Sequence, residues 1–169
     1  DRYQLDESDI SLISTASALH DIGKIMIPEE ILNKPGRLSE EEYATIKTHT
    51  TEGARILKGL AIGQDEPLVK VAHAICRWHH ERWDGGGYPD RLKGDEIPIA
   101  AQVVALADVY DALTSERCYK QSYSHEKAVD MILHGECGSF NPLLMECLKE
   151  SSELLRTELQ RSEYDRGFR

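Results

Sequence analysis

Six side chains of metal-binding type stand at positions where a buried helical core would normally carry apolar residues. One of them, Asp108, follows the apolar run of residues 103–107, where an unpaired carboxylate would be costly to desolvate. A metal ion would offset that cost, and neutral imidazoles would supply its remaining ligands. The sequence therefore predicts a metal site built from two acids and four histidines: His20, Asp21, His49, His79, His80 and Asp108.

The donor types indicate which ions such a site would bind. Nitrogen and carboxylate donors without a thiolate suit Fe, Mn, Zn or Co rather than Ca. Six donors exceed what one catalytic ion uses while keeping a position open, which favours two ions. Asp21 is the natural bridge, since a carboxylate can offer one oxygen to each ion. Two such ions can activate a bridging hydroxide and bind the oxygens of a phosphodiester.

Each of these residues has a simpler explanation when it is taken alone. A single core histidine usually packs with its hydrogen bonds satisfied, which is our interpretation of His73, His125 and His134. A lone aspartate in an apolar helix can pair with an arginine, so the metal prediction depends on six residues converging from four helices. Lys24 follows His20 at i+4, where its ammonium would hold a phosphate or leaving oxygen; a solvated lysine is the alternative.

Seven helices and one irregular loop are predicted to position these residues. Capping residues, prolines and glycines set the boundaries. His49 is expected in the middle of a helix beside Gly53, whose missing side chain leaves room for a neighbour. No segment alternates like a strand, so we predict an all-α fold, a single bundle with a Gly/Pro-rich loop over residues 84–98. The helices are expected from Ser8 or Asp9 to residue 21 and over residues 28–32, 39–58, 67–80, 99–113, 124–135 and 141–163.

Composition limits the classes of protein and partner. The 169 residues suit one domain over residues 1–163 with a frayed tail at 164–169, and the net charge of −10 argues against binding nucleic acid polymers. A small anion held by local cations remains compatible with that charge. No apolar run approaches the ~20 residues of a membrane span, so no insertion is expected. The four cysteines form no C-x-x-C pair, which indicates reduced thiols in the cytoplasm.

The same residues lie in motifs that resemble the HD-GYP family of the HD superfamily. The motifs are HDIGK at residues 20–24, HHE at 79–81 leading into DGGGYP at 84–89, and ADVYDALTS at 107–115 followed by R-x-Y-K. The resemblance runs from about Leu12 to Leu148. It implies an HD-type helical bundle and a bacterial, metal-dependent phosphodiesterase that hydrolyses cyclic di-GMP to linear pGpG and then GMP.

The resemblance also implies roles for individual residues. The six predicted ligands match positions that bind two or three metals, most often iron or manganese, with Zn, Co or Ni as alternatives. Asp21 and Lys24 would be catalytic, Arg117 and Lys120 would contact the phosphates of the dinucleotide, and Tyr88 would lie near the substrate. The chain is expected to lack the family's first helix, which carries a further metal-binding histidine.

Several alternatives stay open. The Gly87-Tyr88-Pro89 loop is implicated in this family in binding GGDEF-type domains, so the chain is alternatively a weakly active or inactive regulatory module. Another alternative is an HD phosphohydrolase for a different nucleotide. Asp84 is either an acceptor for a metal-bound histidine or a turn residue. An apolar stripe on the last predicted helix packs against its own domain or forms a dimer seam: Leu144, Leu148, Leu155 and Leu159.

Overall fold

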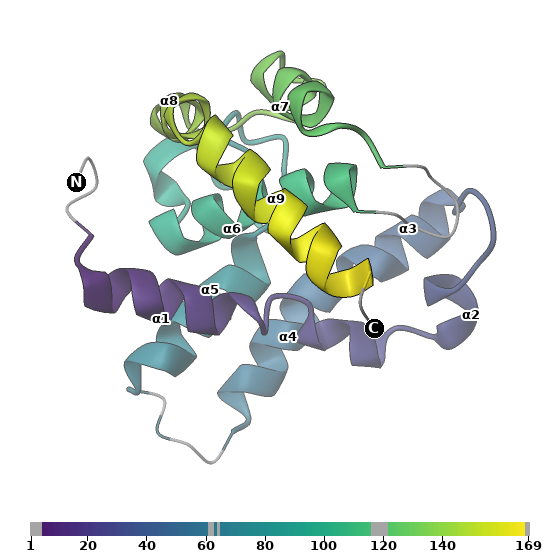
Figure 1. The fold of residues 1–169 in the computed structure, drawn as a ribbon. Helices are drawn as coiled ribbons and strands as arrows, with labels where there is room; N and C mark the ends of the chain where they lie inside the picture. The colour runs from purple at the N-terminus through teal and green to yellow at the C-terminus, as the bar shows by residue number, and fades with distance from the viewer. Residues whose placement is uncertain (1–4, 61–62, 64, 116–121, 168–169) are drawn as a thin grey trace. The chain divides into compact units, whose positions relative to one another are not determined.

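A computed structural model describes residues 5–60, 63, 65–115 and 122–167, with side chains as far as residue 161. These residues form helices, turns and loops without a strand, which confirms the all-α prediction (Figure 1). By their contacts they fall into two compact units, residues 1–105 and 106–169. The expected domain boundary at residue 163 and the expected frayed tail at 164–169 stay predictions.

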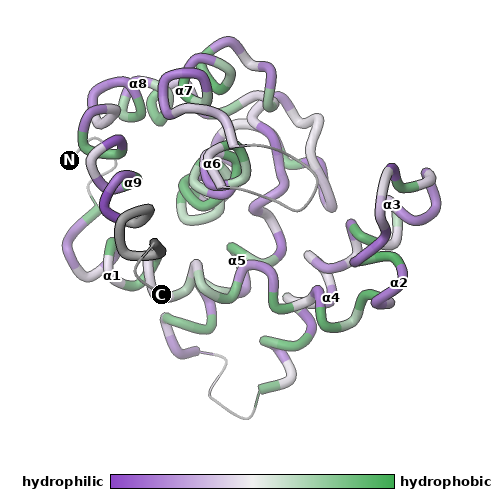
Figure 2. The backbone as a smooth tube through the Cα atoms, turned by 45° about the vertical axis from the view of Figure 1, so that its right-hand side comes forward, coloured by the Kyte–Doolittle hydropathy of each residue, from purple (hydrophilic) through white to green (hydrophobic). Residues whose placement is uncertain are grey.

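The first unit carries α1 to α5 and the start of α6. Short 3-10 turns, η1 and η2, follow α1 and precede α6. Apolar residues recur along α6, which is drawn largely in green in Figure 2. The elements of this unit are α1 (Glu7–Ser17), η1 (Ile22–Met26), α2 (Glu29–Leu32), α3 (Glu40–Lys47), α4 (His49–Lys58), α5 (Pro67–Trp78), η2 (Gly94–Glu96) and α6 (Ile99–Thr114).

The second unit contains the rest of α6 together with α7 (His125–Leu133), α8 (Pro142–Glu150) and α9 (Ser152–Gly167). The described chain thus has more helices than the seven expected, because two predicted helices are each divided. The helix over residues 39–58 is interrupted at Thr48, whose N–H bonds Thr45 O as in a tighter turn. The last helix is interrupted at Ser151, which leaves helical geometry at φ −93° and ψ 3°.

Local chemistry explains most helix boundaries. Ser39 and Glu42 form the predicted capping box at α3, and Gly59 ends α4 as expected. Ser124 caps α7, and Asn141 caps α8 directly before a proline, as predicted. The expected cap of α1 at Ser8 or Asp9 is wrong. Asp6 is the cap, and Asp9 is its reciprocal partner three residues into the helix.

The core of the first unit is formed where α1, α4, α5 and the start of α6 pack together. It includes fully buried Ala16, Ile75 and Cys76, packed with Leu57 and Val104. The Cys76 thiol donates to Leu19 O at 2.9 Å, and burial raises its pKa to about 12, so the thiol stays protonated at neutral pH. Among the described cysteines none is paired, as the sequence suggested.

The second unit has its own core around fully buried Ala128 and Ile132. Leu148 belongs to it and Leu155 packs against it, so the stripe contributes to this unit's own packing. His125 is a buried packing histidine, as interpreted, with its ring nitrogens bonded to Tyr110 and Ser152. His134 does not fit that interpretation, because its side chain is exposed at the end of α7. No described helix is both long and apolar enough to span a membrane.

Candidate metal centre

Three breaks between helices of the first unit carry five of the six predicted metal ligands. His20 and Asp21 were expected to end the first helix but lie beyond it, because i+3 hydrogen bonds at Leu19 and His20 tighten the chain after Ser17. His49 was expected in mid-helix; the interruption at residue 48 makes it the first residue of α4 instead. His79 and His80 directly follow α5. These five ligands therefore stand at helix ends, where loops can bring them together.

A close backbone contact holds η1 against α4 beside these ligands. A Cβ atom at Gly23 would lie 1.9 Å from His49 O and 2.5 Å from Gly53 N, so only glycine fits there. A Cβ at Gly53 would lie 3.2 Å from Gly23 N. The room left by Gly53 is thus filled by the η1 backbone, as its missing side chain suggested. The contact places Asp21, the residue before η1, against His49.

The ligand atoms lie within a few ångströms of one another. Asp21 Oδ1 is 3.4 Å from His49 Nε2, and Asp21 Oδ2 is 3.2 Å from His20 Nε2. His49 Nε2 is also 3.4 Å from His79 Nε2. A ligand atom from each of His49, His79 and His80 falls within 4.8 Å of the others. Each carboxylate oxygen of Asp21 thus faces a different histidine.

Hydrogen bonds fix which ring nitrogen of these histidines can bind a cation. In His20, His49 and His79, Nδ1 lies 2.8–2.9 Å from a backbone carbonyl oxygen three or four residues earlier. A carbonyl only accepts, so Nδ1 carries a proton in all three rings, and Nε2 of the neutral His49 and His79 rings presents a lone pair to the cluster. Asp21 Oδ1 is buried and accepts no hydrogen bond from the described residues. The Nε2 lone pairs of His49 and His79 thus lie together with Asp21 Oδ1, which has no donor among the described residues, an arrangement that a cation satisfies.

The pKa shifts favour the same protonation states. Burial lowers the pKa of His79 to about 4 and also lowers the pKa of His49 and His80, so these rings are neutral at pH 7. Burial alone would raise the pKa of Asp21, but hydrogen bonds with His20 and Lys24 outweigh it and hold that pKa below its ordinary value. Neutral imidazoles and an ionised carboxylate are the forms that bind divalent metals.

The structure describes only some of the other predicted site residues, and only some of those lie at the cluster. Lys24 Nζ donates to Asp21 Oδ2 at 2.5 Å, so this lysine lies at the cluster. Asp108 lies on α6 in the second unit, and its role as a ligand stays a prediction. Arg117 and Lys120 fall outside the described residues. Tyr88 stacks on the His80 ring with centroids 4.8 Å apart and an interplanar angle of 25°.

A buried glutamate that sequence reasoning treated only as part of a motif organises the loop after His80. Glu81 is 3% exposed and accepts a hydrogen bond from Asp90 N at 2.7 Å. The Asp90 side chain accepts in turn from Arg77 and Trp78 on α5. Burial raises the pKa of the Glu81 carboxyl. In the sequence, its position directly after His79 and His80 was the feature that could have marked it as part of the site.

Two other residues complete the loop. A Cβ at Gly87 would lie 2.4 Å from Glu81 Cα, so the loop folds back tightly on the turn after α5 and brings Tyr88 to His80. Asp84 accepts a hydrogen bond from Gly86 N at 2.8 Å, which fits the turn residue among the two alternatives. The loop is thus held by the close backbone contact at Gly87 and by hydrogen bonds to the carboxylates of Glu81 and Asp84.

Fold and cluster together define an all-helical domain with an imidazole–carboxylate centre, and sequence comparison identifies its family. Residues 1–140 match the profile of the HD domain family. The chain therefore belongs to the HD domain family. Its motifs and its curated relatives belong to the HD-GYP group within that superfamily.

Curated relatives align with most of this chain. A protein named "3'3'-cGAMP-specific phosphodiesterase 2" from Vibrio cholerae is 43% identical over 88% of this chain and 28% of its own length. A "Probable cyclic di-GMP phosphodiesterase" of the same organism is 44% identical, covering 86% and 34%. A "Cyclic di-GMP phosphodiesterase" of Thermotoga maritima is 42% identical, covering 95% and 42%. The chain thus spans about a third of the length of these relatives.

One solved structure shares the fold. It is a cyclic GMP-AMP-specific phosphodiesterase of Vibrio cholerae, V-cGAP3, with a TM-score of 0.62 and 21% sequence identity. The match covers 90% of this chain and 40% of that chain. At this level of sequence identity, the structural similarity is evidence for the helical fold alone.

Proposed function

We propose that this chain is a metal-dependent phosphodiesterase domain that hydrolyses cyclic di-GMP to linear pGpG and, further, to GMP. The observation that carries the proposal is the convergence of His20 Nε2 and His49 Nε2 on the two oxygens of Asp21, with His79 Nε2 3.4 Å from His49 Nε2 and with Asp21 Oδ1 accepting no hydrogen bond from the described residues. The names of the curated relatives support the substrate class, since both cyclic di-GMP and 3'3'-cGAMP are cyclic dinucleotides.

The residues present fit a pair of divalent ions, with Fe or Mn ahead of Zn, Co or Ni. Bound there, the ions would polarise the phosphate and lower the pKa of water, which is the usual contribution of a two-metal site to phosphoester hydrolysis. The two oxygens of Asp21 face different histidines, an arrangement that supports a bridging role. The residues that would hold the ions are His20, Asp21, His49, His79, His80 and Asp108.

Cationic and aromatic side chains would bind the dinucleotide. Lys24 donates a hydrogen bond to Asp21, and its ammonium would lie beside the scissile phosphate. Arg117 and Lys120 would contact the phosphates, with Arg offering two parallel donors. Tyr88, stacked on His80, would border the substrate. Local cations of this kind are needed because the chain carries a net charge of −10.

The setting of the domain is also part of the proposal. The domain would lie in the bacterial cytoplasm, because cysteines stay reduced there. The proposed substrate class is consistent with that compartment. A GGDEF-type domain would bind the loop at Gly87-Tyr88-Pro89, and the adjacent Gly86 is exposed enough to be reached. A dimer remains an alternative arrangement of the whole protein.

Product analysis tests the function directly. Protein purified without oxygen and loaded with Mn or Fe should convert cyclic di-GMP to linear pGpG, with 3'3'-cGAMP as the parallel substrate. Asp21→Ala should abolish turnover, whereas Asp95→Ala, an exposed acid on η2, should keep it. Unchanged turnover in Asp21→Ala would refute the proposed mechanism. Tight dinucleotide binding without turnover by the metal-loaded protein would instead favour a regulatory module.

A further inference from the structure

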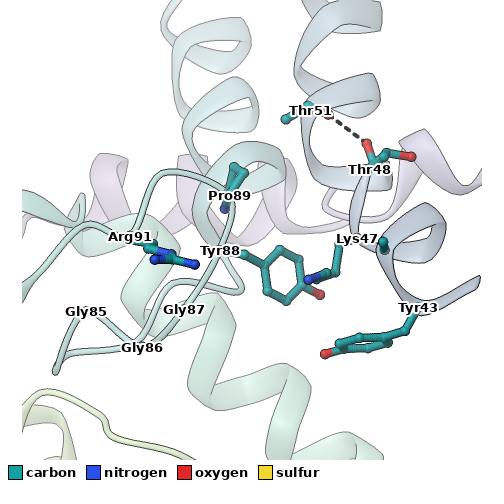
Figure 3. Close-up of a pocket in the computed structure, with 11 residues that line it drawn as sticks. Tyr43, Lys47, Thr48, Thr51, Gly85, Gly86, Gly87, Tyr88, Pro89 and Arg91 are labelled. Carbon is teal, nitrogen blue, oxygen red and sulfur yellow. Dashed lines mark hydrogen bonds between the residues drawn. The ribbon is translucent and has the colours of Figure 1, made fainter. Parts of the chain in front are cut away.

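A cavity of about 570 Å³ opens in the first unit beside Tyr88, between α3, the start of α4 and the loop of residues 85–91 (Figure 3). This volume lies within the range of small-ligand sites, ~300–1,000 Å³. The side chains that carry the argument are Tyr43 and Lys47 from α3 and Tyr88 and Arg91 from the loop. None of these four residues is a predicted metal ligand, so the cavity extends beyond the metal centre.

Two aromatic rings and one ammonium meet in this cavity. Lys47 Nζ lies 5.1 Å from the centroid of the Tyr43 ring and 5.8 Å from that of Tyr88. Figure 3 shows the Tyr88 ring directed toward Lys47, with Tyr43 nearby on the same helix as the lysine. Tyr43 is 49% exposed, so part of its ring is accessible to a partner although Lys47 lies over one face. Such rings provide stacking surfaces for a nucleobase, which every base can use through its π face.

The cavity is also lined by two cations that have no carboxylate partner among the described residues. Neither Lys47 nor Arg91 forms an ion pair with any described residue, although acidic residues outnumber basic ones by 30 to 20 in the chain. Arg91 has a φ of +58°, an uncommon conformation for a residue other than glycine. Strained backbone of this kind tends to be kept at functional sites. The combination of rings and unpaired cations fits a ligand that is both aromatic and anionic.

Tyr88 connects this cavity to the metal centre. Its ring stacks on His80 while it also lines the cavity, so one side chain borders both. The loop that carries it is held by the Glu81 hydrogen bond and by the tight contact at Gly87. A ligand with a phosphate at the metal centre therefore has a preformed place for a neighbouring group.

We propose that this cavity binds one nucleotide unit of the substrate, with the base stacked on Tyr43 or Tyr88 and a phosphate paired with Lys47 and Arg91. The inference rests on the proposed phosphodiesterase function and deepens it, since it assigns a base-binding subsite next to the cleaved bond. Tyr43, Lys47 and Arg91 are then residues that determine specificity for nucleotides over simple phosphodiesters.

Binding of GMP to the metal-loaded full chain tests the subsite separately from catalysis, because GMP carries no diester bond. Calorimetric titration should show that Tyr43→Ala and Lys47→Met each weaken GMP binding about 10-fold. Lys70→Met replaces an exposed lysine on α5 that pairs with Asp65 and does not line the cavity, and this variant should bind GMP as the wild type does. Inorganic phosphate should bind more weakly than GMP, and the Tyr43 substitution should leave its affinity unchanged.

Kinetics provide a second readout. In Tyr43→Ala and Lys47→Met, kcat/KM should fall about 10-fold further for cyclic di-GMP than for methyl p-nitrophenyl phosphate, a diester without a base. Unchanged GMP affinity in both variants would overturn the subsite even if cyclic di-GMP is hydrolysed. Equal binding of phosphate and GMP would also overturn it. If the protein hydrolyses no diester, the proposed function fails, and the GMP titration still decides whether the cavity binds a nucleotide.

Discussion

Replacement of Gly23 by alanine should disrupt the metal centre although no ligand residue is replaced. The new Cβ would lie 1.9 Å from His49 O, 2.5 Å from Gly53 N and 2.9 Å from His49 C, all of them backbone atoms that cannot rotate away. The η1 turn must therefore move off α4 and carry Asp21 away from His49. Overpacking of this kind costs about 1–3 kcal/mol. For a chain of this size, that corresponds to a fall in Tm of about 2–12 °C.

Thermal unfolding and metal analysis on the same sample measure both consequences. Gly23→Ala should show the lower Tm together with reduced metal content. Gly59→Ala is the matched control, because its Cβ would meet its nearest neighbours at 3.4 and 3.6 Å, in ordinary contact, and its φ is −81°. That variant should unfold within about 0.5 kcal/mol of the wild type. A Gly23→Ala protein with wild-type Tm and metal content would refute the reasoning about the η1–α4 contact.

Two further predictions concern stability. Ile132→Ala removes a fully buried side chain from the core of the second unit and should cost about 2–5 kcal/mol in chemical denaturation, whereas Leu154→Ala, 64% exposed, should cost under about 0.5 kcal/mol. Arg77→Met should cost about 1 kcal/mol at pH 7, since it removes two hydrogen bonds to a partly exposed Asp90 carboxylate. The hydrogen bond from Arg77 lowers the pKa of Asp90, so the stabilisation is complete above about pH 4 and is lost as pH falls through the lowered value. Equal losses at pH 7 and pH 2 would contradict this pairing.

Helix boundaries were predictable where a single residue supplies the cap. Ser39, Ser124 and Asn141 act through their own side chains on backbone N–H groups two or three residues later, so sequence alone contains the interaction. The interruptions at Thr48 and Ser151 were missed because both residues are acceptable inside a helix. Only the packing of the flanking segments decides that the helix stops there.

The candidate ligands were predictable because an imidazole or carboxylate is out of place among apolar residues. The four histidines and Asp21 stand out for this reason, and the folded chain brings them together. Lys47 and Tyr43 were not recognised as site residues, since neither is of metal-binding type and both are common on helices for reasons of packing or solvation. Their significance depends on a loop some forty residues later that places Tyr88 beside them, which no local pattern contains.

The central claim is that Asp21 and the surrounding histidines bind divalent metal. Elemental analysis of protein purified without oxygen, compared between the wild type and the isosteric Asp21→Asn variant, tests it most directly, with circular dichroism to confirm that both are folded. The account predicts stoichiometric Fe or Mn in the wild type and loss of most of that metal in the folded variant. A wild-type protein that stays metal-free after loading with Mn or Fe, or a variant that retains the full metal content, would contradict it.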